Sequence, residues 1–362
     1  MSETRAVWPL VSVVMPVRNE AAFIARNLEA VLAQDYPADR LEVLVADGMS
    51  EDATREIVRE LIHRTRRGAA RAAGGAPAEV AEDSPVVLVD NPDRIMPAGA
   101  NAAIRRARGE IVLLLGGHAE LPAGYIRACV SCLLETGADC AGGAMVSVGE
   151  GELGGAIAAA MSSPFGIGNS GFRAAPQHSA PVPTDTVPFG AYRRDVFARV
   201  GLFNPGMVRH QDYEFNYRLR RAGGRILLLP GLKATYHVRS TLPGLWRQYW
   251  QYGIWKGRFV RRFPDSLRAR HLAPSLFALG LLASAFLAPA FHAARVTLAI
   301  LGATYLAFVL AASLAFAARG QARHVPWLPL VMPCLHLSYG LGVWLGLLMP
   351  RVAAAPALER TA

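Results

Sequence analysis

Residues Val11–Glu20 read VSVVMPVRNE, and the fold prediction starts from them. The first five residues form an apolar run rich in β-branched side chains, and Pro16 ends the run, as is typical of a buried strand. A second run of this kind, LEVLVA, occupies Leu41–Ala46 and is followed by Asp-Gly. Between the two runs, residues 21–33 carry apolar side chains at helical spacing. A strand, a helix and a strand in this order predict two parallel strands joined by a crossover helix.

The same alternation continues along the chain. Residues 52–66 have a helical apolar stripe, residues 86–89 resume a strand, residues 98–108 are helical and residues 111–115 form another strand. Residues 66–84 are rich in Ala, Gly, Pro and charge without periodicity, which predicts a flexible surface insertion. We therefore expect an α/β fold with a largely parallel sheet, whose carboxyl edge is the usual place for a ligand.

A long apolar region fills most of the last third of the chain. Three segments in it, about Leu272–Phe291, Val296–Ala318 and Val325–Met349, each come near the roughly 20 residues that a helix needs to span hydrocarbon. They predict about three transmembrane helices within 272–350, followed by a short tail at 351–362. A large buried helical domain is the alternative for the same residues.

The chain is basic, with a formal net charge of +10. A basic protein can bind nucleic acid, anionic lipid or a phosphorylated substrate. The sequence contains no nucleic-acid-binding motif, so we expect no nucleic-acid partner. A cluster of cations stands directly before the apolar region, where lipid headgroups would lie, and predicts an amphipathic interfacial region at 240–271. These cations are Arg247, Lys256, Arg258, Arg261, Arg262, Arg268 and Arg270.

Four cysteines offer no disulfide framework. Cys129 and Cys132 form a CxxC without a second pair, and their spacing favours reduced core residues on one helix face over a metal site. Trp8–Val17 is too short, and too interrupted by proline, to be a signal segment. The part of the chain before the apolar region is therefore expected to stay in the cytosol.

Two motifs at strand ends indicate more than a fold class. VSVVMPVRNE at Val11–Glu20 is joined by DGMSEDAT at Asp47–Thr54, and matching stretches continue to about Pro264. Together they resemble the family 2 glycosyltransferases with the GT-A fold, most nearly the succinoglycan-type exopolysaccharide branch. The resemblance implies a nucleotide-diphospho-sugar transferase domain with a Rossmann-like mixed sheet at 1–239, ahead of C-terminal transmembrane helices.

The resemblance places donor binding on these first motifs. A carboxylate at a strand end can accept a hydrogen bond from a ring N–H of uracil or guanine. From the residues alone, Asp47 is equally well a turn or N-cap residue. The residues that would line the nucleotide pocket are Pro16, Arg18, Asn19, Glu20 and Asp47.

NPDRIMPAGANAAIR at Asn91–Arg105 resembles the family segment that precedes the metal strand. There Gly99 and Asn101 would allow close approach to the donor diphosphate. Arg94 or Arg105 would add positive charge. A capped helix start is the alternative for this segment.

The family's metal motif would fall at Gly116-Gly117-His118, where relatives usually carry Asp at the position of Gly116. A divalent cation, Mg²⁺ or Mn²⁺, would bridge the diphosphate and stabilise the leaving nucleotide. His118, Glu120 and His237 remain as candidate ligands. Three alternatives stay open: the diphosphate itself holds the cation, arginines replace it, or activity is reduced.

HQDYEFNYRLRRAGG at His210–Gly224 resembles the family's acceptor-side motif, in which an acidic residue is the general base. Asp212 matches that residue, because inversion needs a base that removes the acceptor proton as its oxygen attacks. Phe215, Leu219 and Ala222 have helical spacing, so the motif opens a helix. An ordinary N-cap is the alternative for Asp212.

Two neighbours of this residue, Gln211 and Glu214, are expected on the acceptor and sugar side. Glu214 also stands four residues before Arg218, which is the spacing of a simple orienting ion pair. DTVPFGAYRR, ending at Arg194, resembles the stretch that shapes the same side. Its Phe189 and Gly190 would form a sugar-facing floor or an ordinary loop.

RQYWQYG, beginning at Arg247, resembles an interface helix of the same branch. In that helix Gln248 and Tyr252 would face the site, while the aromatic and cationic side chains suit the headgroup layer.

The sequence thus predicts a membrane-anchored, inverting glycosyltransferase of the plasma membrane. It would move a hexose from a nucleotide-sugar, by family weight a UDP-sugar, to a lipid-linked saccharide on a polyprenyl diphosphate. One alternative is a non-catalytic GT-A subunit, which Gly116 favours. A processive polysaccharide synthase is disfavoured by the few spans and the lack of Gln-x-x-Arg-Trp. A sugar nucleotidyltransferase gives no reason for the anchor.

Overall fold

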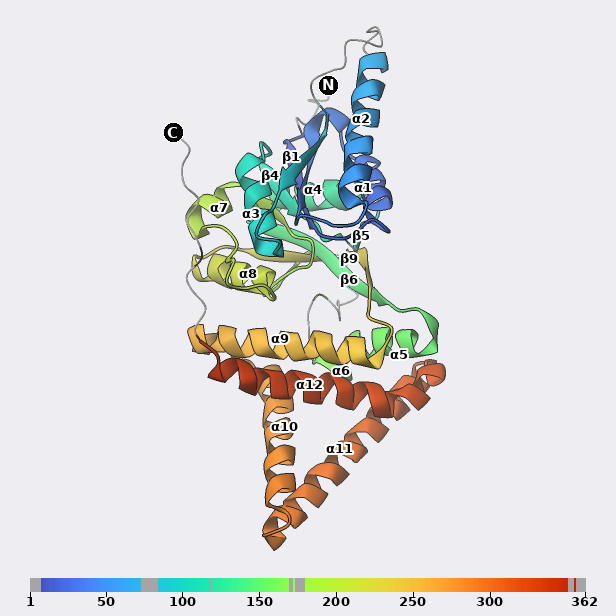
Figure 1. Ribbon diagram of the computed structural model, residues 1–362, viewed down its shortest axis with the longest axis vertical. Helices are drawn as coiled ribbons and strands as arrows, with labels where there is room; N and C mark the ends of the chain where they lie inside the picture. Colours follow the sequence, from blue (N-terminus) through green and yellow to red (C-terminus); the bar gives the residue numbers. More distant parts are fainter. Residues whose placement is uncertain are drawn as a thin grey trace. The chain divides into compact units, whose positions relative to one another are not determined.

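The computed structural model describes residues 8–72, 84–117, 119–168, 172, 180–350 and 355. The chain forms two compact units. The first is built mainly on Met1–Met145 and Pro176–Thr235, and the second on Val146–Ala175 and Tyr236–Ala353. Figure 1 shows the sheet of the first unit and the helices of the second.

A mixed sheet forms the centre of the first unit (Figure 1). Its order among the described strands is β3-β2-β1-β4-β8-β6-β9-β5, with β7 paired to β9. The strands β1 to β4 run parallel, whereas β8 runs antiparallel to β4 and β6. The strands are β1 (Val11–Val17), β2 (Leu41–Asp47), β3 (Val86–Asp90), β4 (Ile111–Leu114), β5 (Ala119–Glu120), β6 (Cys140–Val148), β7 (Val182–Pro183), β8 (Ala191–Arg193) and β9 (Ile226–His237).

Helices connect these strands, and the first three are those that the alternating pattern predicted. They are α1 (Ile24–Leu32), α2 (Thr54–Ala72), α3 (Met96–Arg106), α4 (Tyr125–Thr136), α7 (Asp195–Val200) and α8 (Gln211–Arg221). The predicted helix at 52–66 is wrong at its far end, because α2 continues to Ala72 and takes in the first residues of the expected insertion. Residues 73–83, the rest of that insertion, lie outside the described residues.

The core of the first unit explains why these segments are strands and helices. All seven residues of β1 and of β2 are buried, since both faces of these strands are covered. Cys129 and Cys132 lie buried on α4 as free thiols, so the prediction of core cysteines is confirmed. Burial raises the pKa of the Cys132 thiol, as expected for a thiol in an apolar core.

Helices make up most of the second unit. Its segment 146–175 contributes α5 and α6 beside the C-terminal helices, which the sequence did not indicate. Two short 3-10 helices, η2 and η3, connect longer ones. The elements are α5 (Gly151–Met161), α6 (Pro164–Ile167), α9 (Leu242–Arg262), η2 (Pro264–Ser266), α10 (Ala269–Leu287), α11 (His292–Ala318), η3 (Ala322–Trp327) and α12 (Leu328–Leu348).

The three apolar segments of the sequence become α10, α11 and α12. By length and composition, His292–Ala318 and Ala322–Leu348 are long enough to cross a membrane, and His271–Leu287 is a shorter apolar helix. Only 11% of the apolar window of α11 is buried, against 50% for that of α12. A core helix of a soluble domain would be mostly buried, so the alternative of a buried helical domain does not fit α11.

Candidate active site

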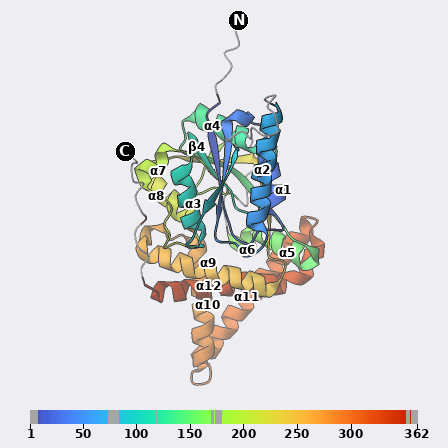
Figure 2. The same ribbon diagram turned by 45° about the horizontal axis from the view of Figure 1, so that its top comes forward.

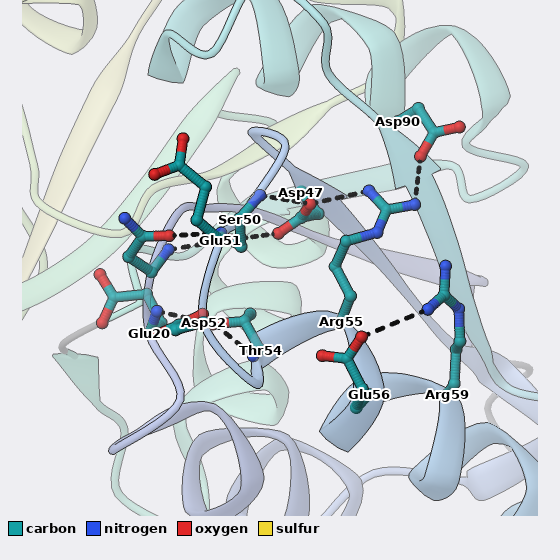
Figure 3. A network of polar contacts seen from close by, with 11 residues as sticks. Glu20, Asp47, Ser50, Glu51, Asp52, Thr54, Arg55, Glu56, Arg59 and Asp90 are labelled. Atoms are coloured by element: carbon teal, nitrogen blue, oxygen red, sulfur yellow. Dashed lines mark hydrogen bonds and ion pairs between the residues drawn. The ribbon is translucent and has the colours of Figure 1, made fainter.

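Asp47 is the most buried of the predicted polar donor-side residues. It ends β2, in register with Val17 of β1 and Asp90 of β3 at the carboxyl edge of the parallel strands. Its side chain is fully buried, and its Oδ2 accepts hydrogen bonds from the backbone N–H of Ser50 at 3.0 Å and from Nη1 of Arg55 at 2.8 Å (Figure 3). The Ser50 hydroxyl donates to Oδ1. A turn and a cation therefore hold this carboxylate in place.

Arg55 joins two strand ends and was missed by the sequence analysis. While Nη1 holds Asp47, Nη2 donates to Oδ1 of Asp90 at 2.7 Å, and the Asp90 side chain is 67% exposed (Figure 3). Hydrogen bonds to Asp90 and then to Asp47 raise the pKa of Arg55. A signal existed in the sequence, because Arg55 stands in the first turn of the helix that follows the Asp47 motif.

The loop after β1 is fastened to the loop after β2. The Asn19 backbone N–H donates to the Ser50 hydroxyl at 2.9 Å, and the Asn19 Oδ1 accepts from the Glu51 backbone N–H at 2.9 Å. The Glu20 backbone N–H donates to the Thr54 hydroxyl at 2.8 Å. The structure thus brings the two predicted donor motifs together along one edge (Figure 3).

Two arginines flank the same edge. Arg18 and Arg94 approach Oε1 of Glu51 at 3.5 and 3.6 Å, and both guanidinium groups are about half exposed. Exposed pairs of this kind contribute little to stability. Arg18 and Arg94 place positive charge where a donor diphosphate is expected. Arg105, the other predicted cation, is an exposed residue near the end of α3.

The start of α3 packs closely against β1 because Gly99 has no side chain. A Cβ there would come within 2.7 Å of Asn91 Nδ2 and 3.3 Å of Pro16. The N-cap residue Ile95 makes no side-chain capping bond, so the alternative of an ordinary capped start is wrong. The Asn101 side chain is buried and holds both backbone groups of Phe203, donating to its O at 2.8 Å and accepting from its N–H at 2.9 Å.

The candidate metal position is built from few ligands. Glu120 forms an ion pair with Arg26 at 2.5 Å, and Gly117 lies against Glu20, where an added Cβ would meet the carboxyl carbon at 3.0 Å. His118 lies outside the described residues. No group of three His, Cys, Asp or Glu that could hold an ion occurs in the part of the chain that the structure describes. Those residues do not fit a metal cage made by protein ligands alone.

Asp212 is the second residue of α8, and His210 is the N-cap. The alternative of an ordinary N-cap is therefore wrong for Asp212. Its partly buried carboxylate accepts the Tyr213 backbone N–H at 2.8 Å. Burial raises the pKa of Asp212, opposed only in part by hydrogen bonds from backbone N–H groups. A carboxyl with a raised pKa is closer to the range in which a general base works well.

Aromatic packing fixes α8 in position. Tyr192 of β8 meets Phe215 edge to face at 5.3 Å between ring centroids, and Phe215 stacks on Phe203 at 4.6 Å. The Tyr192 hydroxyl donates to Asn216 Oδ1 at 3.1 Å. Burial raises the pKa of Tyr192 most, and the nearby Cys140 and then Asp212 raise it further. The carboxylate therefore lies beside a rigid aromatic cluster.

The other predicted acceptor-side residues fall into two kinds. Glu214 is buried and forms the expected ion pair with Arg218 at 2.8 Å. The Arg218 guanidinium also donates to the backbone oxygens of Val200 and Leu202. This pair orients α8. The Gln211 side-chain Oε1, by contrast, is buried without a hydrogen-bond partner among the described residues.

Phe189 and Gly190 stand in a tightly held loop. The Tyr125 hydroxyl donates to the backbone O of Phe189 at 3.1 Å and accepts the Gly143 N–H at 2.8 Å. A Cβ at Gly190 would come within 2.9 Å of the Tyr192 ring. Phe189 packs, partly buried, against the core, so the loop is a rigid feature of the first unit.

Strained backbone collects in the predicted site segments. The described non-glycine residues with positive φ are Asn19, Met49, Arg94, Phe189 and His210. Each lies in a segment that the sequence analysis assigned to the donor or acceptor side. Such conformations cost of the order of 1–3 kcal/mol each and tend to gather where function requires them.

In the second unit, Gln248 and Tyr252 lie one turn apart on α9. The Gln248 Nε2 donates to the hydroxyls of Tyr236 at 2.9 Å and Tyr252 at 3.0 Å. Its Oε1 is buried without a partner in the described chain. His237 follows Tyr236 at the end of β9, in the same unit.

Comparison with known proteins agrees with this geometry. A family model described as glycosyl transferase family 2 matches residues 12–201, which is more than half of the chain. The chain is a family 2 glycosyltransferase. This glycosyltransferase is 32% identical over 244 residues to succinoglycan biosynthesis protein ExoA of Rhizobium meliloti (strain 1021), and the match covers 67% of each chain.

Two further relatives are more distant. The glycosyltransferase is 24% identical over 258 residues to a dolichyl N-acetyl-alpha-D-glucosaminyl phosphate 3-beta-D-2,3-diacetamido-2,3-dideoxy-beta-D-glucuronosyltransferase of Methanococcus voltae, covering 70% of this chain and 74% of that one. Its structure is similar to mannosyltransferase PcManGT from Pyrobaculum calidifontis in complex with GDP-Man and Mn²⁺. The TM-score is 0.53 at 22% identity, over 90% of this chain and 86% of that chain. This likeness confirms the predicted GT-A fold.

Proposed function

We propose that this glycosyltransferase moves a hexose, with inversion, from a nucleotide-sugar to a lipid-linked saccharide during exopolysaccharide or cell-surface glycan synthesis. A UDP-sugar is the expected donor and a polyprenyl-diphosphate saccharide the expected acceptor. The relatives named for succinoglycan biosynthesis and for transfer to a dolichyl-linked sugar support this reading. The observation that carries it is the Asp212 carboxylate, partly buried at the start of α8 with a raised pKa.

Asp212 has the chemistry that an inverting transfer needs. It would take the proton of an acceptor hydroxyl while that oxygen forms a bond to the anomeric carbon of the donor. The bond from the anomeric carbon to the diphosphate breaks on the opposite face, and the nucleoside diphosphate leaves with the bonding pair. Tyr192 and the aromatic cluster behind it hold the helix, which fixes the direction of the carboxylate.

On the donor side, the fastened loops after β1 and β2 would receive the nucleotide. Asp47 is enclosed by Ser50 and Arg55, so its part is to hold the loop in shape. Arg18 and Arg94 are placed to meet the negative charge of the diphosphate. This arrangement favours arginines as a substitute for part of the charge that a divalent cation supplies, although a relative was solved with Mn²⁺.

Membrane attachment fits the proposed acceptor. A polyprenyl diphosphate stays in the bilayer, so its sugar reaches only an enzyme held at the surface. The apolar helices α10 to α12 would provide the anchor, and the cations of α9 suit the headgroup layer of the plasma membrane. The nucleotide-sugar is cytosolic, so the catalytic unit would face the cytosol.

A transfer assay tests the proposal. The purified full chain is screened with nucleotide-sugars by thermal shift, since a bound donor raises apparent stability. The stabilising donor is then supplied with polyprenyl-diphosphate saccharides in vesicles, and product is followed with wild type and Asp212→Asn. Transfer by wild type that the variant loses supports the proposal; equal transfer by both overturns the assigned base.

One other function has a specific observation in its favour. Gly116 replaces the usual Asp of the metal motif, which suits a scaffold subunit that binds a donor without turning it over. In the same assay such a subunit would show a donor-induced thermal shift but neither transfer nor donor hydrolysis, with or without Mn²⁺.

A further inference from the structure

The two helices α9 and α12 of the second unit run side by side in the same direction (Figures 1 and 2). Near one end, the Cys334 thiol contacts the backbone O of Leu242 at 3.5 Å. Near the other end, Nη1 of Arg261 donates to the backbone oxygens of Leu347 at 2.9 Å and Met349 at 2.7 Å. The arginine therefore satisfies carbonyl groups that the end of α12 leaves free.

Between these ends the two backbones touch. Gly253 and Gly257 of α9 face Gly342 and Gly346 of α12, one turn apart on each helix. A Cβ at Gly253 would lie less than 3.0 Å from the backbone O of Tyr339, and a Cβ at any of the other three would meet partner backbone equally closely. Small residues at this spacing allow such close approach between helices. The pair is therefore a single packed element.

The composition of α9 sets the depth of this pair. Within 21 residues it carries Arg247, Lys256, Arg258, Arg261 and Arg262, too many cations for a helix that crosses hydrocarbon. Its aromatic side chains, with Trp246 exposed beside Arg247, suit the headgroup layer instead. Because α12 is fastened along α9, it lies at the same depth, although its length and composition alone would allow it to cross.

The helices α10 and α11 have the opposite character. They leave α12 and converge at the turn around residues 288–291 (Figures 1 and 2). With 19 residues, α10 is about 28 Å long, close to the thickness of the hydrocarbon layer, and the longer α11 can tilt. His292 and Arg295 provide polar groups just after the turn. Their exposed apolar side chains include Leu276, Leu279, Leu282, Phe286, Ile300, Leu306, Leu310 and Leu314.

We infer that the described chain crosses the bilayer twice, through an α10–α11 hairpin, while the α9–α12 pair lies along the membrane surface on the catalytic side. The occupant of the hairpin surface is the hydrocarbon of the bilayer. The inference rests on the proposed membrane attachment, but not on the donor or acceptor. It replaces the three crossings expected from the sequence, and it returns the chain after α12 to the cytosolic face, where three crossings would leave it outside.

Reporters on the full chain in a Gram-negative bacterium test this topology. A fluorescent protein fused after residue 362 should fluoresce, and alkaline phosphatase fused at the same place should be inactive. His292→Cys, at the hairpin turn, should react with a membrane-impermeant maleimide in intact cells, whereas wild type, whose four cysteines are buried, should not. Active phosphatase after residue 362, or an unlabelled His292→Cys, would overturn the inference. Recovery of the protein in the soluble fraction would instead overturn the proposed membrane attachment.

A matched glycine pair tests the contact that sets the depth of α12. Gly257→Ala places a methyl group against the backbone of α12, whereas Gly302→Ala, on α11, meets nothing within 4 Å. In detergent, Gly257→Ala should lower the thermal midpoint by several degrees and Gly302→Ala should leave it unchanged. Equal midpoints for the two variants would show that α12 does not pack on α9 and would overturn the inference.

Discussion

Two aspartates of the first unit, both expected at the active site, lie in opposite environments. Asp47 is fully buried, and a guanidinium group and a turn take up its oxygens. Asp212 is partly buried, and only backbone N–H groups oppose the burial that raises its pKa. The first carboxylate is held by a compensating cation, whereas the second is the one that, in our proposal, takes a proton from the acceptor.

The surroundings of each aspartate determine what its carboxylate can do. A buried carboxylate beside a cation can hold loops together, because its charge has a partner. A desolvated carboxylate without a cation has a high affinity for protons. Removing the cation beside Asp47 and the charge of Asp212 tests whether the two carboxylates have these separate tasks.

The largest effect is expected when the charge of Asp212 is removed. Asp212→Asn keeps the shape of the side chain but cannot accept the acceptor proton, so the transfer rate should fall by about 10²–10⁴-fold. Initial rates at saturating donor measure this. As a control, Glu214→Gln should weaken the pair with Arg218 and lower stability, with less effect on the chemical step. Wild-type rates in Asp212→Asn would refute the role of base.

The next effect concerns the cation that compensates Asp47. Arg55→Ala leaves a buried carboxylate without its partner, which should lower the free energy of unfolding by about 3–5 kcal/mol. Urea unfolding of the protein in detergent measures the loss. Asp90→Asn is the matched control, because it removes the exposed contact of the same arginine and should cost less than about 1 kcal/mol. Similar losses in both variants would contradict a structural role for the Asp47–Arg55 pair.

A pH profile sharpens the contrast. The base must be ionised, so kcat/KM should fall as pH drops through the raised pKa of Asp212, starting above the ordinary aspartate value of about 3.9. The stability effect has the opposite sign. A folded pKa above the unfolded one favours folding at low pH, and this stability is lost as pH rises from the unfolded to the folded pKa.

At neutral pH, Asp212→Asn should therefore raise the thermal midpoint while it lowers the transfer rate. Thermal melts of wild type and variant across the acidic range measure the difference, which should vanish at low pH. A variant that melts below wild type at neutral pH would show that the ionised carboxylate stabilises the fold.

The smallest effect is expected at the metal motif. A Cβ added at Gly116 would meet only the ring edge of Phe189, at 4.0 Å, so there is room for the first atom of a side chain. Gly116→Asp would add the missing oxygen ligand and should lower the Mn²⁺ concentration for half-maximal activity by at least about tenfold. Gly116→Asn, of equal size but uncharged, is the control. An unchanged Mn²⁺ dependence in the aspartate variant would argue that the cation binds elsewhere.

Periodicity was sufficient for the parallel half of the sheet. The apolar run of β1 and the helical spacing in α1 depend on local burial, which the sequence displays directly. The far end of α2 was wrong because its last residues, rich in Ala and Arg, form a helix without an apolar stripe. The segment that forms α5 and α6 was left without an interpretation, since these helices pack on η3 and α12, which lie far along the chain from them.

The site was also predicted only in part, because local motifs can be read from the sequence and contacts between distant segments cannot. Motif resemblance found Asp47 and Asp212, and the structure shows how each is held. The role of Arg55 was not predicted, because its ion pairs with Asp47 and Asp90 depend on the register of β2 and β3, which cannot be read from either segment alone. The pairing of α9 with α12 likewise needs two glycine pairs far apart in the chain to meet.

The amide of Asn101 has a mechanical consequence. Asn101 of α3 bonds to both the N–H and the carbonyl of Phe203, and Phe203 lies in the segment that precedes α8. These bonds tie α3 to that segment. One buried side chain thus joins the proposed donor side to the segment that precedes α8. The contact between the two proposed sides therefore depends on a single amide side chain, although the residues that make it lie 102 positions apart in the chain.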